Sequence, residues 1–323
     1  MWRHFFLTLP IAVLIVAFLQ TSALRSLRDS LPLFVKKHFT TAAPTNPSAT
    51  MTKTPVYFFS HGGPDVQYRT EHPVYPILQS IGREITQKVR PKAVVVFSAH
   101  WQSTPKEIHL NNAVTNPLIY DFYGFPPEFY KATFPSTGSP EIASQIIDLL
   151  TKAGIPAKGV ARGLDHGVFS GFNVAFHQKN NPLTVPLVQV SLFDNENPTA
   201  HYALGRAVSS LRDQNIVIIC TGMTVHNLRD LRRSFGSPKP LPYAVSFDNA
   251  LKEAVEADAK EREEKMKRVC QRPDAREAHP WMDHLMPLYI AAGAAGDDVG
   301  KQTWTMQEGS FAWAQYRFGD VLE

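Results

Sequence analysis

The chain has 323 residues, of which 44% are hydrophobic, so it is long enough to bury a substantial core as one large domain or two. Its formal charge of +4 is concentrated in residues 1–53, which carry +5 and leave about −1 for the rest of the chain. A nearly neutral body without a basic stripe argues against nucleic-acid partners, and two cysteines are too few for a disulfide framework.

The N-terminal segment is predicted to be a hydrophobic leader or anchor over residues 1–30, followed by a linker over residues 31–54. Residues 5–19 form a 15-residue apolar run, which is short for a bilayer span of roughly 20 residues and suits a signal-peptide core or a short anchor. The basic residues that follow are also typical of a mitochondrial presequence. Membrane association, secretion and mitochondrial import therefore all stay open, and translation from Met51 would give a leaderless, cytoplasmic form.

Residues 55–323 are predicted to form a single α/β catalytic domain, because strand-like and helix-like segments alternate along them. Short β-branched runs predict buried strands at 56–59, 93–97, 183–192 and from 216. Helical spacing of apolar or charged residues predicts helices at 74–89, 139–153, 198–212 and 244–268. The last of these is highly charged and is interpreted as a solvated helix. The expected fold is a central, mostly parallel sheet flanked by helices.

Three of the predicted strands run directly into loops that carry a histidine. His61 follows the first strand, His100 the second, and His226 the strand that begins at 216. Because ligands bind beyond the carboxyl ends of strands in open α/β sheets, these three side chains are expected to converge at one edge. A neutral imidazole is the commonest protein ligand for metals, so the sequence predicts a metal or catalytic site at that edge.

An aromatic and proline-rich segment, residues 116–133, is too irregular for a helix or strand and too apolar for an exposed loop. We expect it to wall a pocket. The aromatic side chains that would pack against a flat ligand are Tyr120, Phe122, Tyr123 and Phe125.

Six motifs, in order, resemble those of the class III, LigB-type extradiol ring-cleaving dioxygenases, and within them the DOPA 4,5-dioxygenase branch. The motifs are Ser60-His61-Gly62-Gly63-Pro64, Ser98-Ala99-His100-Trp101, Tyr120-Asp121-Phe122-Tyr123-Gly124-Phe125-Pro126, Leu164-Asp165-His166-Gly167, His226-Asn227-Leu228 and His284-Leu285-Met286-Pro287. Each is weak alone. Together they extend over most of the predicted catalytic domain, from Ser60 to Pro287.

The resemblance implies an enzyme that binds a small catechol on one divalent metal and opens its ring with O₂. It implies that His61 and His100 are metal ligands and that His284 or His226 completes the set. His166 resembles the second-sphere acid/base histidine of the family, and Asp165 is expected to orient it. His226 would alternate between ligand and base.

The nature of the metal stays open between Zn²⁺ and Fe²⁺. Protocatechuate-type relatives use two histidines and a glutamate, whereas this chain has His284 about where that carboxylate would be expected, as in the four-histidine site of the DOPA branch. Imidazoles suit Zn²⁺ at least as well as Fe²⁺, but O₂ activation requires a redox-active metal. We expect Zn²⁺ in isolated protein and Fe²⁺ in the active form.

Two other functions are compatible with the same residues. One is a Zn²⁺ hydrolase that uses metal-bound water, with His166 as the proton shuttle. The other is a non-catalytic member of the fold in which the histidines hold a structural metal. The natural catechol, the position of ring opening and the oligomeric state are not encoded in any motif of the chain.

Overall fold

The computed structural model describes residues 53–234, 237 and 239–321. The leader predicted for residues 1–30 and almost all of the linker lie outside the described residues, as does Met51. Among the helices that are described, none has both the length and the apolar character needed to cross a bilayer.

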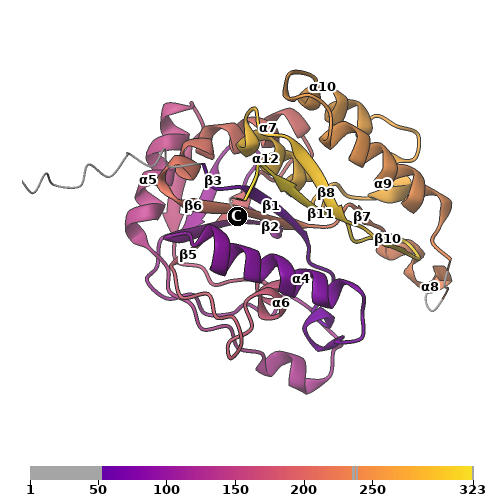
Figure 1. The fold of residues 1–323 in the computed structure, drawn as a ribbon, viewed down its shortest axis with the longest axis horizontal. Helices are drawn as coiled ribbons and strands as arrows, with labels where there is room; N and C mark the ends of the chain where they lie inside the picture. Colours follow the sequence, from indigo (N-terminus) through magenta and orange to yellow (C-terminus); the bar gives the residue numbers. More distant parts are fainter. Residues whose placement is uncertain (1–52, 235–236, 238, 322–323) are drawn as a thin grey trace, which may run out of the picture. The chain divides into compact units, whose positions relative to one another are not determined.

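An eight-stranded sheet forms the centre of the molecule, in the order β4-β3-β5-β2-β6-β1-β11-β8 (Figure 1). Its strands are β1 (Val56–Ser60), β2 (Ala93–Gln102), β3 (Ile108–Asn111), β4 (Ala157–Val160), β5 (Leu187–Leu192), β6 (Ile216–Gly222), β8 (Gly300–Trp304) and β11 (Gln315–Phe318). The central strands β5, β2, β6 and β1 are parallel, whereas β11 and β8 extend the sheet antiparallel at one edge. The predicted fold class, a mostly parallel sheet in one α/β domain, is confirmed.

Helices cover both faces of this sheet (Figure 1). The longer ones are α4 (Val74–Arg83), α5 (Pro140–Lys152), α6 (His166–Ala175), α7 (Pro198–Val208), α9 (Pro242–Val255), α10 (Ala259–Val269) and α12 (Met286–Ala295). Shorter turns are η3 (Val66–Tyr68), η4 (Glu84–Val89), η5 (Pro127–Lys131), η6 (Ser209–Gln214), η7 (Leu228–Asp230), α8 (Leu231–Ser234) and α11 (Ala275–Ala278). Helices α4 and α6 pack on one face, and α5, α7 and α12 pack on the other.

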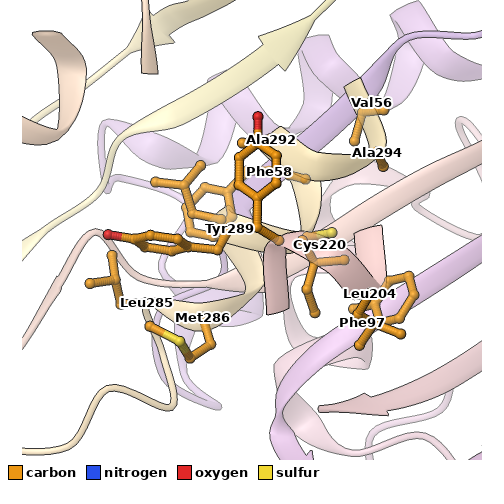
Figure 2. Close-up of a cluster of buried hydrophobic side chains, with 14 of the residues drawn as sticks. Val56, Phe58, Phe97, Leu204, Cys220, Leu285, Met286, Tyr289, Ala292 and Ala294 are labelled. Atoms are coloured by element: carbon orange, nitrogen blue, oxygen red, sulfur yellow. The ribbon is translucent and has the colours of Figure 1, made fainter. Parts of the chain in front are cut away.

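Alternation along the strands builds a separate core on each face. In β1, Val56 and Phe58 point to the α12 side, and Tyr57 and Phe59 point to the α6 side. Figure 2 shows the first core, in which side chains from β1, β2 and β6 meet those of α12. Gly293 lets α12 approach α7 closely, because a Cβ atom there would collide with a backbone carbonyl of α7.

The prediction of a single, solvated charged helix over residues 244–268 is wrong in two respects. The segment forms two helices, α9 and α10, because the chain turns at Asp258, whose backbone is extended. It is also not simply a solvated face, since Arg262 is only 1% exposed. Its guanidinium donates to the carbonyl of Asp298, and the turn at Asp258 brings α10 back to make this bond.

Candidate metal centre and active site

Three histidines from separate segments meet at the carboxyl edge of the sheet. His61 follows β1 directly, His100 lies near the end of β2, and His284 lies two residues before α12. One ring nitrogen from each lies within 4.8 Å of the others, and the Nε2 atoms of His100 and His284 are 3.2 Å apart. His284 is held at this edge because its carbonyl accepts a hydrogen bond from Met223, just beyond β6.

The ring of His61 is buried with neither nitrogen bonded to any described residue. Its exposed fraction is 1%, and both Nδ1 and Nε2 lack a hydrogen-bond partner. A buried polar group without a partner is costly unless something else satisfies it. Burial lowers the pKa of His61 and of His284 well below the ordinary value, and the neighbouring histidines add to the effect. These neutral imidazoles fit a divalent metal ion, which needs unprotonated nitrogen ligands.

His226 lies beside this group rather than in it. It belongs to β7 (Val225–His226), which forms a small sheet with β10 (Phe311–Ala312) and β9 (Gln307–Glu308). Its ring stacks on that of His284, with centroids 3.7 Å apart, and its nitrogens are not among the three that converge. Burial, followed by the proximity of His284, lowers the pKa of His226 well below its ordinary value.

Asp121 connects His166 to the metal-ligand candidates. Its Oδ1 is 2.9 Å from Nδ1 of His166, the first residue of α6, and its Oδ2 is 3.1 Å from Nδ1 of His100. The backbone N–H of His166 also donates to Oδ1. A carboxylate on Nδ1 favours the tautomer that carries its proton there, so in the neutral form of each ring Nε2 is the nitrogen left free to bind a metal ion or to accept a proton.

The electrostatics of this group follow from its burial and its carboxylate. Burial tends to lower the pKa of His100, but the hydrogen bond to Asp121 and the charge of Asp165 outweigh it and the pKa is raised. Burial lowers the pKa of His166, and the charge of His100 adds to this. Burial favours protonation of Asp121, yet its hydrogen bonds to His100 and His166 hold its pKa below the ordinary value. Asp121 is therefore an anion between two imidazoles.

The expected pairing of Asp165 with His166 is wrong. Asp165 is fully buried and accepts hydrogen bonds from Ser98 Oγ (2.6 Å), Gln189 Nε2 (2.5 Å) and Arg162 Nη1 (3.0 Å). Ser98 Oγ in turn accepts from the backbone N–H of His100. The backbone of Asp165 is extended at the start of α6, so its side chain points toward β2 and β5 rather than along the helix. Its role is to support the end of β2.

Three of the four aromatic side chains singled out in this segment pack together beside His166. The ring of Phe122 lies 5.6 Å from that of His166, and those of Phe125 and Tyr120 lie 5.3 and 6.1 Å from Phe122. Tyr123 is 91% exposed and is not part of this group.

Asp121 was not singled out as a functional residue from the sequence. The available signal was Asp121 itself, the one charged residue in the aromatic motif of residues 120–126. Its partner His166 lies 45 positions later, so spacing alone could not pair them.

The sequence of this chain matches a known protein family over most of its length. Residues 47–319 match the family described as the catalytic LigB subunit of aromatic ring-opening dioxygenase. This chain belongs to the LigB family. LigB enzymes are metal dependent, and the predicted class, an extradiol ring-opening dioxygenase, is confirmed.

Several curated relatives of this chain carry names that refer to DOPA. The chain is 37% identical over 230 residues to a 4,5-DOPA dioxygenase extradiol-like protein of Schizosaccharomyces pombe, covering 70% of this chain and 75% of that protein. It is 32% identical over 272 residues to a 4,5-DOPA dioxygenase extradiol of Beta vulgaris, covering 81% and 95%. A solved structure of an uncharacterized Escherichia coli K12 protein has the same fold, with a TM-score of 0.67, 24% identity and coverage of 83% and 100%.

Proposed function

We propose that this enzyme cleaves the ring of a DOPA-like catechol with O₂, using one divalent metal ion held by His61, His100 and His284. The observation that carries the proposal is the convergence of one ring nitrogen from each of these three histidines, among which the buried His61 has a lowered pKa and no other partner for either nitrogen. The names of the curated relatives support the substrate class.

The bound metal would stabilise the ionised diol as a Lewis acid and supply the redox chemistry that O₂ requires. His61, His100 and His284 leave coordination positions open if they are the only protein ligands. Iron suits the active form, and zinc suits the same imidazoles in isolated protein.

The proposed acid/base residue is His166, whose Nε2 would take a proton from the diol and return one later. A neutral imidazole is suited to accept a proton first, and the lowered pKa of His166 favours that form. Asp121 would stabilise the imidazolium that results, because it already holds Nδ1. Phe122 would pack against the flat ring of the substrate beside His166.

His226 is proposed to position His284 rather than to bind the metal. The stacked geometry limits rotation of the His284 ring and keeps its Nε2 directed at His100. This retains His226 in the active site with a role different from the ligand or base expected from the resemblance.

The test is anaerobic reconstitution with Fe²⁺ followed by addition of air and a panel of catechols, with O₂ uptake as the readout. We expect uptake equal to the catechol consumed, and its loss in His61→Ala and His166→Ala. His177→Ala is the matched control, because His177 is partly exposed and its Nδ1 only accepts from Lys179 N–H. Activity with Zn²⁺ in the absence of O₂ would overturn the proposal and select a hydrolase.

A further inference from the structure

The end of β6 is hydrogen-bonded to the backbone of two of the three proposed metal ligands. The N–H of His61 donates to the carbonyl of Gly222 at 3.0 Å, and the N–H of Met223 donates to the carbonyl of His284 at 2.9 Å. The ring centroids of His61 and His284 are 5.4 Å apart. Gly222 and Met223 therefore connect two ligands that lie far apart in the sequence.

Gly222 lets the segment that carries His284 approach the strand closely. A Cβ atom at Gly222 would lie 2.1 Å from the carbonyl oxygen of His284, so any other residue type would require a shift of the backbone. This approach brings the N–H of Met223 within reach of the same carbonyl. The connection to His284 is thus made by backbone atoms alone.

The connection to His61 is made by the side chain of Met223. Its Sδ accepts a hydrogen bond from the backbone N–H of Gly62 at 3.3 Å, and Met223 is only 2% exposed. A thioether is a weak acceptor, but it is the acceptor for this N–H among the residues that the structure describes. Replacing the sulfur with a carbon atom would leave a partly buried N–H without that partner.

Gly62 is also in contact with the ring of Trp313. The backbone of Gly62 has a positive φ of 66°, and a Cβ atom there would lie 2.3 Å from the indole. Nε1 of Trp313 donates to Glu308 at 3.2 Å, which fixes the ring. The peptide that follows His61 is therefore confined by a sulfur atom and an aromatic ring.

His61 depends on its backbone for orientation more than the other two ligands do. A metal-binding histidine usually donates its second ring N–H to a carboxylate or carbonyl, which orients the ring. His100 has such a partner in Asp121, and the ring of His284 is stacked on that of His226. Neither nitrogen of His61 bonds a described residue. Its ring is therefore oriented by packing and by the peptides on either side of it.

The peptide before His61 is held by a different side chain. The buried amide of Gln315 accepts from the N–H of Ser60 and donates to the carbonyl of Ser60, both at 3.2 Å. These bonds fix the end of β1. Gln315 and Met223 thus hold the backbone on the two sides of His61.

We propose that Met223 is a positioning residue of the metal centre, whose sulfur holds the peptide after His61 while its N–H holds the carbonyl of His284. The inference rests on the proposed function for the identity of these two ligands. Both imidazoles are then in place before the metal binds, so that less ordering accompanies binding. A methionine that only filled a gap in the core would contribute packing without this effect.

The first test measures Co²⁺ binding to the metal-free protein by chelator competition and the visible absorption spectrum of the bound ion. Met223→Leu keeps a buried apolar side chain of similar volume and removes the acceptor. We expect it to weaken Co²⁺ binding about tenfold and to shift the spectrum, because the nitrogen of His61 is less well directed. Met223→Gln should recover part of the affinity, since its amide oxygen can accept from Gly62. Met266→Leu, at a buried methionine of α10 in the core on the other face of the sheet, is the control and should bind as wild type does.

The second test needs no metal. Hydrogen exchange of metal-free protein, followed by mass spectrometry of peptides that contain Gly62, reports directly on the N–H that the sulfur accepts. We expect this amide to exchange about fivefold faster in Met223→Leu than in wild type, which is the effect of losing one hydrogen bond. Met266→Leu should leave the same peptides unchanged.

Wild-type Co²⁺ affinity in Met223→Leu would overturn the inference, even if the variant is less stable in urea or exchanges faster at Gly62. Weaker Co²⁺ binding with unchanged exchange would also overturn it, because the effect would then not pass through Gly62. Failure of the proposed function is distinguishable, because His61→Ala would then bind Co²⁺ as tightly as wild type does. Wild type that binds no Co²⁺ would overturn both.

Discussion

The ring of His226 lies nearly parallel to that of His284, with planes inclined by 10° and centroids 3.7 Å apart. We therefore expect His226→Phe, which keeps a flat ring in the stack, to retain about the wild-type ratio of metal to chain. His284→Ala should lose most of its metal, because it removes a nitrogen of the converging group. Elemental analysis of the two purified variants measures the ratio of metal to chain. Equal metal loss in both would show that His226 is a ligand.

Asp121 holds two imidazoles at once, so its replacement should affect both the metal and the acid/base residue. We expect Asp121→Asn to lower kcat and metal affinity by about 10- to 100-fold each, as for other carboxylates that orient metal-bound histidines. Chelator competition gives the affinity, and O₂ uptake gives kcat. Asp194→Asn, at an exposed aspartate, is the control. Wild-type metal affinity in Asp121→Asn would show that Asp121 does not position His100.

Asp165 should contribute to stability more than to chemistry. Its carboxylate is fully buried and neutralises Arg162, so Asp165→Ala leaves that charge and the donors of Ser98 and Gln189 without a partner. We expect a loss of about 3–5 kcal/mol in the free energy of unfolding. Urea denaturation of the metal-free protein measures it. Asp213→Ala, at a half-exposed aspartate, should change stability by less than about 0.5 kcal/mol, and a similar small loss at Asp165 would contradict the assignment.

His201 makes stability depend on pH below neutrality. Burial lowers its pKa from 6.5 to about 4 in the folded protein, although its Nδ1 bonds the carbonyl of Asn197. The unfolded chain therefore binds the proton more tightly, so stability is full above pH 6.5 and falls as the pH drops toward 4. The loss from this residue is at most about 3 kcal/mol. His201→Phe should flatten the stability profile between pH 7 and 4.5, measured by denaturation, and parallel profiles would contradict the expectation.

The sequence predicted the parts of the site that depend on local pattern. β-branched runs followed by small residues placed His61 and His100 beyond β1 and near the end of β2, because buried parallel strands have a clear signature. The resemblance added His284, whose position before α12 has no such local signal. The parallel core and its covering helices followed from the same alternation of strand and helix.

The pairings between distant residues could not be predicted in this way. Asp165 precedes His166 in the chain, yet the extended backbone at the start of α6 turns its side chain toward Ser98 and Gln189. The carboxylate that holds Nδ1 of His166 is that of Asp121, which lies 45 residues earlier in the chain. Similarly, the break between α9 and α10 brings Arg262 to the carbonyl of Asp298, a contact that no helical pattern records.

Mass spectrometry of the product formed under ¹⁸O₂ tests most directly whether this protein opens catechol rings at the histidine group. With Fe²⁺-loaded wild type and 3-(3,4-dihydroxyphenyl)propionate, 4-ethylcatechol or DOPA, we expect one product that contains both ¹⁸O atoms and an aldehyde carbon, and none from His61→Ala. A product labelled only from water, or one that keeps the aromatic ring intact, would contradict the proposal.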